Sequence, residues 1–242
     1  MQRYKIRVQY DGSEFYGWQQ QKSARTVQSE LERALSVLNA GQRSPVIGAG
    51  RTDSGVHATG QVAHFDLATV WSPPELLRAL NGNLPEDLRI RDCELVEPNF
   101  HARFSARRRS YEYHCRIDDF LLDRNHVWNT GPLDMNAMEP AAALIRGEHD
   151  FRTFSKIRRD LPHHRCTIYQ SLWKEDQTGL IYVVVANRFL HHMVRYLVGS
   201  MVAIGQGKIS LARFEKMLNE PVNEKLIFRA PARGLILTEV SY

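Results

Sequence analysis

The sequence predicts an α+β protein made of two similar halves, each a mostly antiparallel sheet backed by helices. Three observations support this fold class. Several segments alternate apolar and polar residues with the period of two typical of strands, other segments place apolar residues at helical spacing, and one residue spacing occurs twice. We place the halves at residues 1–105 and 106–242, joined around a central basic cleft. A chain of 242 residues, 43% of them hydrophobic, can bury a substantial core.

The first segment has the alternation of a half-buried strand. Apolar and polar side chains alternate from Tyr4 to Tyr10, which is the pattern of a strand with one face in the core. Residues 11–21 read D-G-S-E-F-Y-G-W-Q-Q-Q, a loop rich in glycine and aromatic residues. Its aromatic side chains, Phe15, Tyr16 and Trp18, can stack on bases, but core packing is the preferred interpretation.

Two helices are predicted in the first half. Thr26 is a favourable N-cap for the first helix. Its apolar positions are Val27, Leu31, Leu35 and Leu38, and its outward charges are Glu30, Glu32 and Arg33. Residues 72–75 read S-P-P-E, a capping box with proline at the first helical position. The second helix has Leu76, Leu77 and Leu80 as its buried stripe and should end at Asn81-Gly82.

Further strands follow from the same alternation and from turn residues. We expect them at residues 61–65, 88–93, 111–117, 167–173, 180–186 and 235–240. The segment from Asn99 to Ser110 is a basic connection between two of these strands. Gly179 lies between the runs 167–173 and 180–186, so these two strands should form a hairpin.

The second half should contain three helices. Residues 135–145 form the first, where Pro140 should delay or kink the start because proline breaks the hydrogen-bond ladder. An apolar helix from Phe189 to Met201 carries His192 and Arg195, and a half-buried arginine needs an acidic partner. Ser210 caps the third helix. The spacing Ser72, Leu76, Leu80, Asn81 returns as Ser210, Phe214, Leu218, Asn219, which suggests that the two halves repeat one plan.

The charge distribution favours nucleic acid. The formal net charge is +5 and the pI is about 9.2, which is only mildly basic. Arginines and histidines nevertheless gather in three clusters: Arg103, Arg107, Arg108 and Arg109; Arg158, Arg159, His163, His164 and Arg165; and Arg188, His191, His192 and Arg195. The arginine guanidinium binds phosphate oxygens in a bidentate manner. Each cluster alone is also compatible with a solvated face, but the three together favour RNA or DNA.

Other classes of protein are disfavoured. The three cysteines, Cys93, Cys115 and Cys166, are too few and too far apart for a disulfide framework or a thiolate zinc site. No run is long and apolar enough for a membrane span, and the start of the chain is a charged, alternating segment rather than a signal peptide. We therefore expect a cytoplasmic protein without a membrane association.

Residues 48–58, G-A-G-R-T-D-S-G-V-H-A, read as a sharp active-site turn. Their glycines can bend the chain tightly and present Asp53 on a rigid base. An ordinary surface turn is the alternative for this stretch alone, because Asp, Ser and Gly all favour turns. Arg51 does not decide between the two, since opposite charges are often close together on loops.

Several motifs agree in order with one family. Residues 50–58, G-R-T-D-S-G-V-H-A, resemble the signature of the pseudouridine synthases of the TruA type. Further stretches resemble that family: Tyr10-Asp-Gly with Phe15-x-Gly-Trp-Gln19, Asn81 with Leu84-Pro85, Phe100-His-Ala-Arg-Phe104, Tyr111-x-Tyr113, Asn187-x-Phe-Leu-x-His-Met-Val-Arg195 and Ala230-Pro-Ala-Arg-Gly-Leu235. The resemblance covers nearly the whole chain.

The resemblance implies an isomerase that converts uridine to pseudouridine at positions 38–40 of the tRNA anticodon stem-loop. Asp53 matches the family's nucleophile, and a carboxylate can do this work without metal or other cofactor. Arg195 resembles the basic partner that keeps the aspartate ionised, with Arg51 as the competing candidate. Tyr111 matches the tyrosine that packs on the flipped uracil, and Leu235 resembles the pocket wall. The resemblance also implies a homodimer.

Two other functions stay open on the sequence. One is a non-catalytic RNA-binding module, in which Asp53 only shapes a turn. The other is a hydrolase that uses Asp53 with His57. A metal site is disfavoured because the histidines show no paired ligand spacing.

Overall fold

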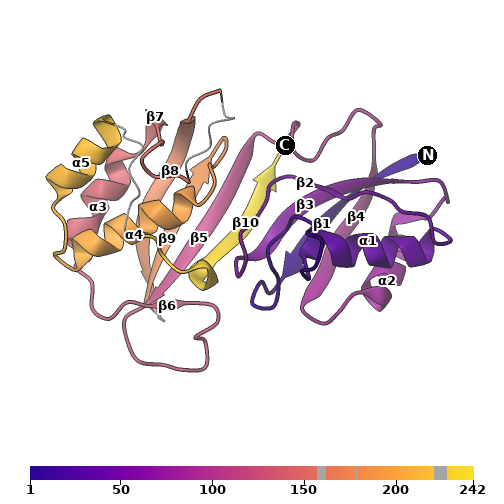
Figure 1. Ribbon diagram of the computed structural model, residues 1–242, viewed down its shortest axis with the longest axis horizontal. Helices are drawn as coiled ribbons and strands as arrows, with labels where there is room; N and C mark the ends of the chain where they lie inside the picture. Colours follow the sequence, from indigo (N-terminus) through magenta and orange to yellow (C-terminus); the bar gives the residue numbers. More distant parts are fainter. Residues whose placement is uncertain (157–161, 178, 221–227) are drawn as a thin grey trace. The chain divides into compact units, whose positions relative to one another are not determined.

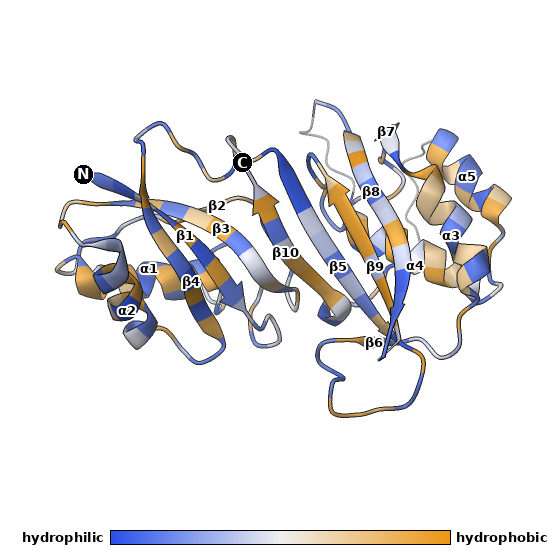
Figure 2. Cartoon of the chain, turned by 180° about the vertical axis from the view of Figure 1, so that it is seen from behind, coloured by the Kyte–Doolittle hydropathy of each residue, from blue (hydrophilic) through white to orange (hydrophobic). Residues whose placement is uncertain are grey.

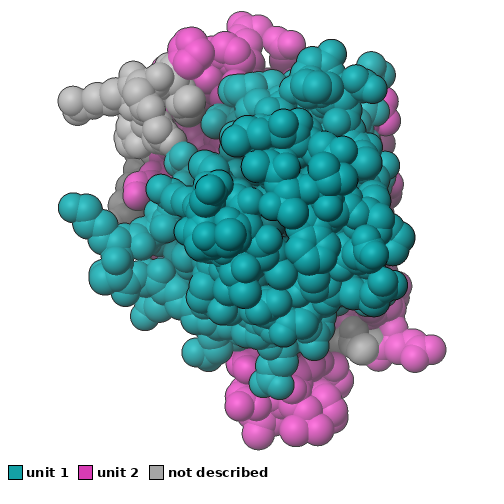
Figure 3. Space-filling view, turned by 90° about the vertical axis from the view of Figure 1, so that its right-hand side faces the viewer, with its two compact units in different colours: residues 1–107, 236–242 teal, residues 108–235 magenta. Residues whose placement is uncertain are grey.

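The chain forms two compact units. A computed structural model describes residues 1–156, 162–177, 179–220 and 228–242. Unit 1 contains residues 1–107 and 236–242, and unit 2 contains residues 108–235 (Figures 1 and 3). The last strand thus belongs to unit 1, although the predicted division placed it in the second half. The assignment of residues 1–105 and 106–242 as domains stays a prediction.

Unit 1 is built on a sheet with β1 (Gln2–Tyr10) near its centre. Strands β3 (His57–Leu67) and β4 (Leu88–Val96) pair with β1 in antiparallel orientation. The short β2 (Ile47–Gly48) pairs with β3, and β10 (Leu235–Ser241) runs parallel to β3 on its other side. The strands predicted in this unit are confirmed.

Two helices cover one face of this sheet (Figure 1). Helix α1 (Val27–Leu38) begins after Thr26, whose side chain accepts a hydrogen bond from the Ser29 backbone N–H. Helix α2 (Pro73–Asn83) begins after the predicted S-P-P-E capping box, and it ends two residues after the predicted position. The buried alternate side chains of β1 and the apolar stripes of the helices form the core of unit 1.

Glu32 is a correction to the predicted outer face of α1. Its side chain is buried, with 5% exposed. The carboxylate accepts hydrogen bonds from the Val46 backbone N–H at 3.1 Å and from Arg43 Nε at 3.0 Å. The Val46 N–H, just before β2, requires a hydrogen-bond acceptor, and the Glu32 carboxylate on α1 supplies it. This explains why a charged side chain is buried at this position.

Unit 2 contributes a run of antiparallel strands of its own. Its strands lie in the order β5 (Arg108–Arg116), β9 (Gly179–Ala186), β8 (Arg165–Asp176) and β7 (Gly147–Asp150). The short β6 (Trp128–Asn129) pairs with β5 in parallel. The predicted hairpin is β8 and β9. Strand β9 is apolar along most of its length (Figure 2), as expected for the best-buried strand of the sheet.

The helices of unit 2 lie on one face of its sheet (Figures 1 and 2). They are α3 (Met135–Leu144), α4 (Met193–Gly205) and α5 (Leu211–Asn219), and a 3₁₀ turn, η1 (Ala232–Gly234), precedes β10. Ser210 caps α5 as predicted, by accepting from the Arg213 N–H. Pro140 does not delay α3, because Asp134 caps the helix at its predicted start and Pro140 lies inside it.

Helix α4 begins four residues later than the apolar pattern indicated. Phe189 and Leu190 precede it, and His192 is its N-cap with a left-handed backbone, φ +64°. The apolar run that begins at Phe189 therefore covers both the end of a loop and the start of the helix. Arg158 and Arg159 of the second arginine and histidine cluster lie outside the described residues.

The mixed architecture confirms the predicted α+β class. Within the part of the chain that the structure describes, no helix has both the length and the apolar character needed to span a membrane.

Candidate active site

Asp53 lies half-buried in the turn between β2 and β3. The Val56 N–H donates to the Asp53 carbonyl at 3.2 Å, which closes the turn, and Gly55 follows with a positive φ of +76°. Thr52 beside it is buried, with 7% exposed. The backbone of this turn is thus fixed, as expected of a rigid platform for the carboxylate.

The loop of residues 11–21 packs directly on the backbone of this turn. A side-chain carbon added at Gly17 would lie 2.6 Å from the Thr52 carbonyl oxygen, and Gly17 itself has φ +86°. A carbon added at Gly12 would lie 2.1 Å from the Val56 carbonyl oxygen. Only glycine fits at these two positions without moving the turn that carries Asp53.

Hydrogen bonds join the same two segments. The Trp18 N–H donates to the Thr52 carbonyl at 3.1 Å. The Phe15 carbonyl accepts from the Gly55 N–H and from Ser54 Oγ, both at 3.3 Å. Two of these bonds join backbone groups and the third comes from the Ser54 hydroxyl, so that the loop holds the turn on either side of Asp53. The two motifs, forty residues apart in the sequence, therefore form one structural element.

The aromatic residues of the loop divide between the core and the surface. Phe15 and Trp18 are buried, with 1% and 2% exposed, which confirms core packing for both. Tyr16 has 62% of its surface exposed, so the core interpretation is wrong for this residue. The alternation arises because Gly17 must contact the turn, and this leaves the preceding side chain directed to solvent.

A buried pair of hydroxyl groups lies under the turn. Tyr10 Oη and Thr52 Oγ1 are 2.8 Å apart. Burial raises the pKa of Tyr10 well above its usual value, although its hydrogen bonds to Thr52 and Gln61 act in the opposite direction. The phenol is therefore neutral at every physiological pH and serves as a fixed hydrogen-bonding group below the turn of Asp53.

His57 fastens the loop to the start of β3. Its side chain is 3% exposed, and its Nδ1 accepts a hydrogen bond from the Gly12 N–H at 2.9 Å. Because an Nδ1 that accepts cannot carry a proton, its 3.2 Å approach to Asp11 is not an ion pair formed through Nδ1. This geometry favours a structural role for His57 over a role as the general base of a hydrolase.

Arg51 is exposed next to Asp53. Among the described residues the structure assigns it no hydrogen bond or ion pair. An exposed guanidinium beside the turn is available to a phosphate.

The other predicted site residues belong to unit 2. Tyr111 lies on β5 opposite Val184 of β9 and is buried, with 9% exposed. Its ring meets the ring of Phe189 edge to face, with centroids 5.1 Å apart. Phe189, in the loop before α4, was assigned to that helix by its pattern and instead supports this tyrosine.

Arg195 lies in the first turn of α4 and is 9% exposed. Its Nε donates to the Ala230 carbonyl at 2.9 Å, and the Ala230 N–H donates to the Arg195 carbonyl at 3.0 Å. The guanidinium is thus oriented by the carbonyl of Ala230, the first residue of the A-P-A-R-G-L motif.

The same motif reaches β5. Tyr113 donates its hydroxyl to the Pro231 carbonyl at 2.9 Å, and Leu235, 5% exposed, follows η1. Tyr111 and Tyr113 are two residues apart and so point to the same face of the strand. Within unit 2, Tyr113 and Arg195 therefore both contact the segment that leads to Leu235, and Tyr111 lies on the same face of β5 as Tyr113. Asp53 and Arg51 belong to unit 1, and the convergence of the two sets stays a prediction.

No feature of the sequence indicates that the backbone of His192 is strained. It has a left-handed backbone without being glycine, a conformation that costs free energy and that often marks functional sites. Arg229 Nη1 lies 3.3 Å from its Nδ1, and the rings of His191 and His192 are 4.0 Å apart. No propensity signal in an apolar run predicts such a conformation.

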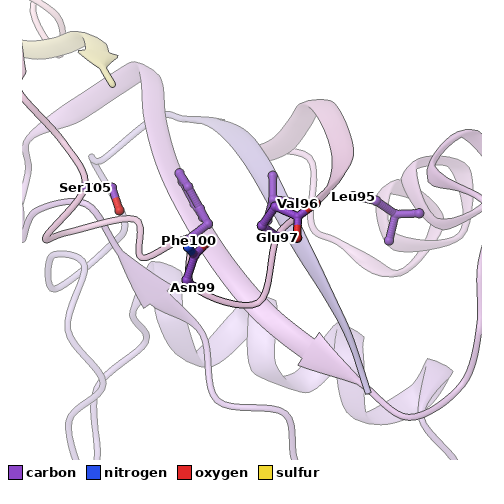
Figure 4. A pocket seen from close by; sticks show the side chains of 6 residues that line it. All are labelled: Leu95, Val96, Glu97, Asn99, Phe100 and Ser105. Atoms are coloured by element: carbon purple, nitrogen blue, oxygen red, sulfur yellow. The ribbon is translucent and has the colours of Figure 1, made fainter.

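A hollow of about 610 Å³ lies elsewhere in unit 1 (Figure 4). Its lining residues are Leu95, Val96, Glu97, Asn99, Phe100 and Ser105. None of the predicted site residues is among them. The candidate active site is therefore identified by the turn of Asp53 and not by this hollow.

Comparison with known proteins decides the family. A sequence model described as tRNA pseudouridine synthase matches residues 6–105 and 141–242. The chain belongs to the tRNA pseudouridine synthase family. Asp53, Arg51, Arg195 and Leu235 fall within the matched residues, whereas Tyr111 falls between them.

Relatives of this family match along the whole chain. The protein is 41% identical to tRNA pseudouridine synthase A of Geobacillus sp. (strain WCH70), over 99% of this chain and 98% of the relative. It is 41% identical to the protein of that name from Dictyoglomus thermophilum, over the full length of both, and 40% identical to that of Maridesulfovibrio salexigens, over 100% of this chain and 91% of the relative. The predicted family and enzyme class, an isomerase, are confirmed, and the non-catalytic module is not favoured.

Proposed function

We propose that this pseudouridine synthase isomerises uridine at positions 38–40 of the tRNA anticodon stem-loop, with Asp53 as the nucleophile. The observation that carries this proposal is the prebuilt turn of Asp53, whose backbone is fixed on both sides by the loop of residues 11–21. Preorganised groups need no rearrangement when the reaction occurs. This suits a reaction in which the residue must act on a base held only briefly in the site.

The chemistry needs a single carboxylate. The bond from ribose C1′ to uracil N1 breaks, the base turns over, and C1′ bonds to C5; C5 then loses a proton and N1 gains one, so no atoms are added overall. An ionised Asp53 can attack C1′, attack C6 of the base, or assist an elimination that leaves a glycal. Each route requires the carboxylate in its charged form inside a site from which water is excluded.

Arg195 supplies the positive charge in this proposal. A cation close to a buried carboxylate lowers its pKa and keeps it ionised. The contacts of Arg195 with Ala230 hold its guanidinium in one orientation, which supports a fixed partner over a mobile surface charge. Arg51 is the competing cation, and its exposure favours an RNA contact instead.

Tyr111 and Leu235 form the uracil pocket in this proposal. The Tyr111 ring is held edge to face by Phe189 and can pack on a flipped base, and its hydroxyl can transfer the proton at C5. Leu235 provides an apolar wall. Extrusion of the uridine from the stem costs a few kcal/mol, which contacts between arginines and phosphates must offset.

We also propose that the enzyme acts as a homodimer in the cytoplasm. Both parts rest on the resemblance to the family. Sedimentation equilibrium of the purified protein tests the dimer, and a monomer at micromolar concentration would exclude it.

The nucleophile is tested by removing the charge of Asp53 alone. Unmodified tRNA is incubated with wild-type protein, Asp53→Asn and Asp53→Ala without added metal, and pseudouridine is measured. Both variants should lose detectable turnover while they retain RNA binding. Asp92→Asn is the matched control, because it makes the same chemical change on the exposed strand β4. Full activity of Asp53→Asn would falsify the assignment.

A further inference from the structure

A tight turn in unit 1 presents an aromatic ring to solvent. Phe104 has 76% of its surface exposed, although large apolar side chains are usually buried. Its ring lies 4.3 Å from the ring of His101, with an angle of 32° between the planes. The guanidinium carbon of Arg103 lies 5.6 Å from the centroid of the same ring. The turn therefore exposes an aromatic ring that has a second, tilted ring and a cation beside it.

The turn is held rigidly by its own hydrogen bonds. His101 Nδ1 accepts from the N–H groups of Arg103 and Phe104, at 3.1 and 3.2 Å. The His101 N–H donates to Ser105 Oγ at 3.1 Å, and the Ser105 N–H donates to the His101 carbonyl at 2.9 Å. A surface aromatic on such a turn loses little conformational entropy on binding.

Ala102 anchors the turn to the sheet. It is fully buried, its N–H donates to His64 Nδ1 at 3.1 Å, and its carbonyl accepts from the Tyr242 hydroxyl at 2.8 Å. Burial, followed by the charge of Arg3, lowers the pKa of His64 to about 4, so this acceptor stays neutral at physiological pH. The position of Phe104 is thus set by contacts to β3 and to the end of the chain.

The surroundings of Phe104 favour an anionic ligand. Arg103 and Arg107 are both exposed in the segment 97–107, which contains a single acid, Glu97. An aromatic face beside arginines is the usual composition of a surface that binds single-stranded nucleic acid. An apolar contact with a protein would not need this excess of positive charge.

This surface is distant from the turn of Asp53. His64 lies seven residues after His57 on β3, which corresponds to about 23 Å along the strand. A base that stacks on Phe104 therefore belongs to a different nucleotide from the one that reacts.

We propose that Phe104, with His101 and Arg103, is a stacking site for an unpaired nucleobase of the tRNA, outside the Asp53 site. This inference rests on the proposed function, since it takes tRNA as the ligand. The site contributes to binding of the RNA and not to the chemical step.

The test compares side chains that differ only in their ability to stack. Phe104→Ala and Phe104→Leu should each raise the Kd for unmodified tRNA by about 5-fold to 150-fold, which is the loss expected for one base stacked on an aromatic ring. Phe104→Trp should bind as tightly as wild type. Binding is measured in the Asp53→Asn background, so that no turnover occurs, and kcat at saturating tRNA is measured with Asp53 present and should not change.

Phe120→Ala is the matched control. Phe120 is also an exposed phenylalanine, with 47% exposed and an arginine carbon 4.5 Å from its centroid. That arginine, Arg116, is paired with Asp118 and Asp123, so its surroundings are acidic. The substitution should leave the Kd for tRNA unchanged.

Salt dependence separates stacking from charge. Phe104→Ala should leave the slope of log Kd against log salt unchanged, whereas Arg103→Gln should reduce it by about 0.7 to 0.9 if this arginine neutralises one phosphate. A Phe104→Leu protein that binds tRNA like wild type, beside a weakened Phe104→Ala protein, would show that apolar bulk and not ring stacking matters at this position, and would overturn the proposal. Unchanged binding by Phe104→Ala would overturn it as well.

The stacking site and the proposed function can be refuted independently of each other. If wild-type protein forms no pseudouridine, the function is wrong, while binding that depends on the Phe104 ring would still support the stacking site. If pseudouridine forms and Phe104→Ala binds normally, only the stacking site is wrong.

Discussion

Gly17 is one of the two glycines at which the loop of residues 11–21 packs against the backbone of the Asp53 turn, Gly12 being the other. Gly17→Ala places a carbon 2.6 Å from the Thr52 carbonyl oxygen and 3.1 Å from the Asp53 carbonyl carbon, at a residue with φ +86°. The left-handed backbone costs about 1–2 kcal/mol for a residue other than glycine. The contact with a carbonyl that cannot rotate away adds about 1–3 kcal/mol. The free energy of unfolding should therefore fall by about 2–5 kcal/mol.

Gly41→Ala is the matched control for this substitution. Gly41 has a similar φ of +81°, but an added carbon would meet no atom within 4 Å. The free energy of unfolding of Gly41→Ala should fall only by the cost of the left-handed backbone, about 1–2 kcal/mol. The difference between the two variants measures the contact with the turn.

Urea unfolding and single-turnover kinetics test the reasoning together. Gly17→Ala should lose stability beyond Gly41→Ala, and it should lower the rate of pseudouridine formation because the carbon displaces the backbone at Thr52 and Asp53. Gly41→Ala should react at the wild-type rate. If the two variants are equally stable and both react normally, the loop does not position Asp53 and the interpretation of the interlocked motifs is wrong.

Three further substitutions probe single contacts. Thr52→Val removes a partner of the buried Tyr10 hydroxyl and should cost about 1 kcal/mol in urea unfolding; no loss would show that the pair contributes nothing. The Tm of the wild type should fall as the pH decreases from 6.5 to 4, because His64 takes up a proton at a higher pH in the unfolded chain than in the folded one. The Tm of His64→Gln should fall less over that range. Arg195→Lys should reduce kcat strongly although the charge is kept, because lysine has no planar guanidinium to hold against Ala230; wild-type kcat would contradict this.

The periodic parts of the fold could be predicted from the sequence, because alternation and helical spacing record which faces are buried. Strand β1 and helix α1 lie where the patterns placed them. Glu32 could not be predicted, since its burial depends on the Val46 N–H, which comes from another segment. The start of α4 was missed because Phe189 and Leu190 in the preceding loop continue the apolar pattern of the helix.

The turn of Asp53 was singled out by its residue types, but the contacts that support it were not. Gly12 and Gly17 stood in the sequence as parts of a family motif without a physical role. Their role depends on contacts to Thr52 and Val56, some forty residues away, and periodicity carries no information about such contacts. The division of Phe15, Tyr16 and Trp18 between core and surface follows from the same contacts.

The contacts between the loop of residues 11–21 and the turn of Asp53 also determine how a substitution at Asp53 can be interpreted. The loop contacts the turn through the Thr52 carbonyl, the Gly55 N–H and the Val56 carbonyl, which are backbone atoms that remain when the side chain at position 53 changes. Asp53→Asn should therefore unfold at nearly the same urea concentration as wild type, whereas Gly17→Ala should not. Loss of activity in the first variant then reports on the carboxylate itself, and loss in the second reports on its position. If Asp53→Asn is as unstable as Gly17→Ala, the side chain helps to hold the turn, and inactivity of that variant alone would no longer identify the nucleophile.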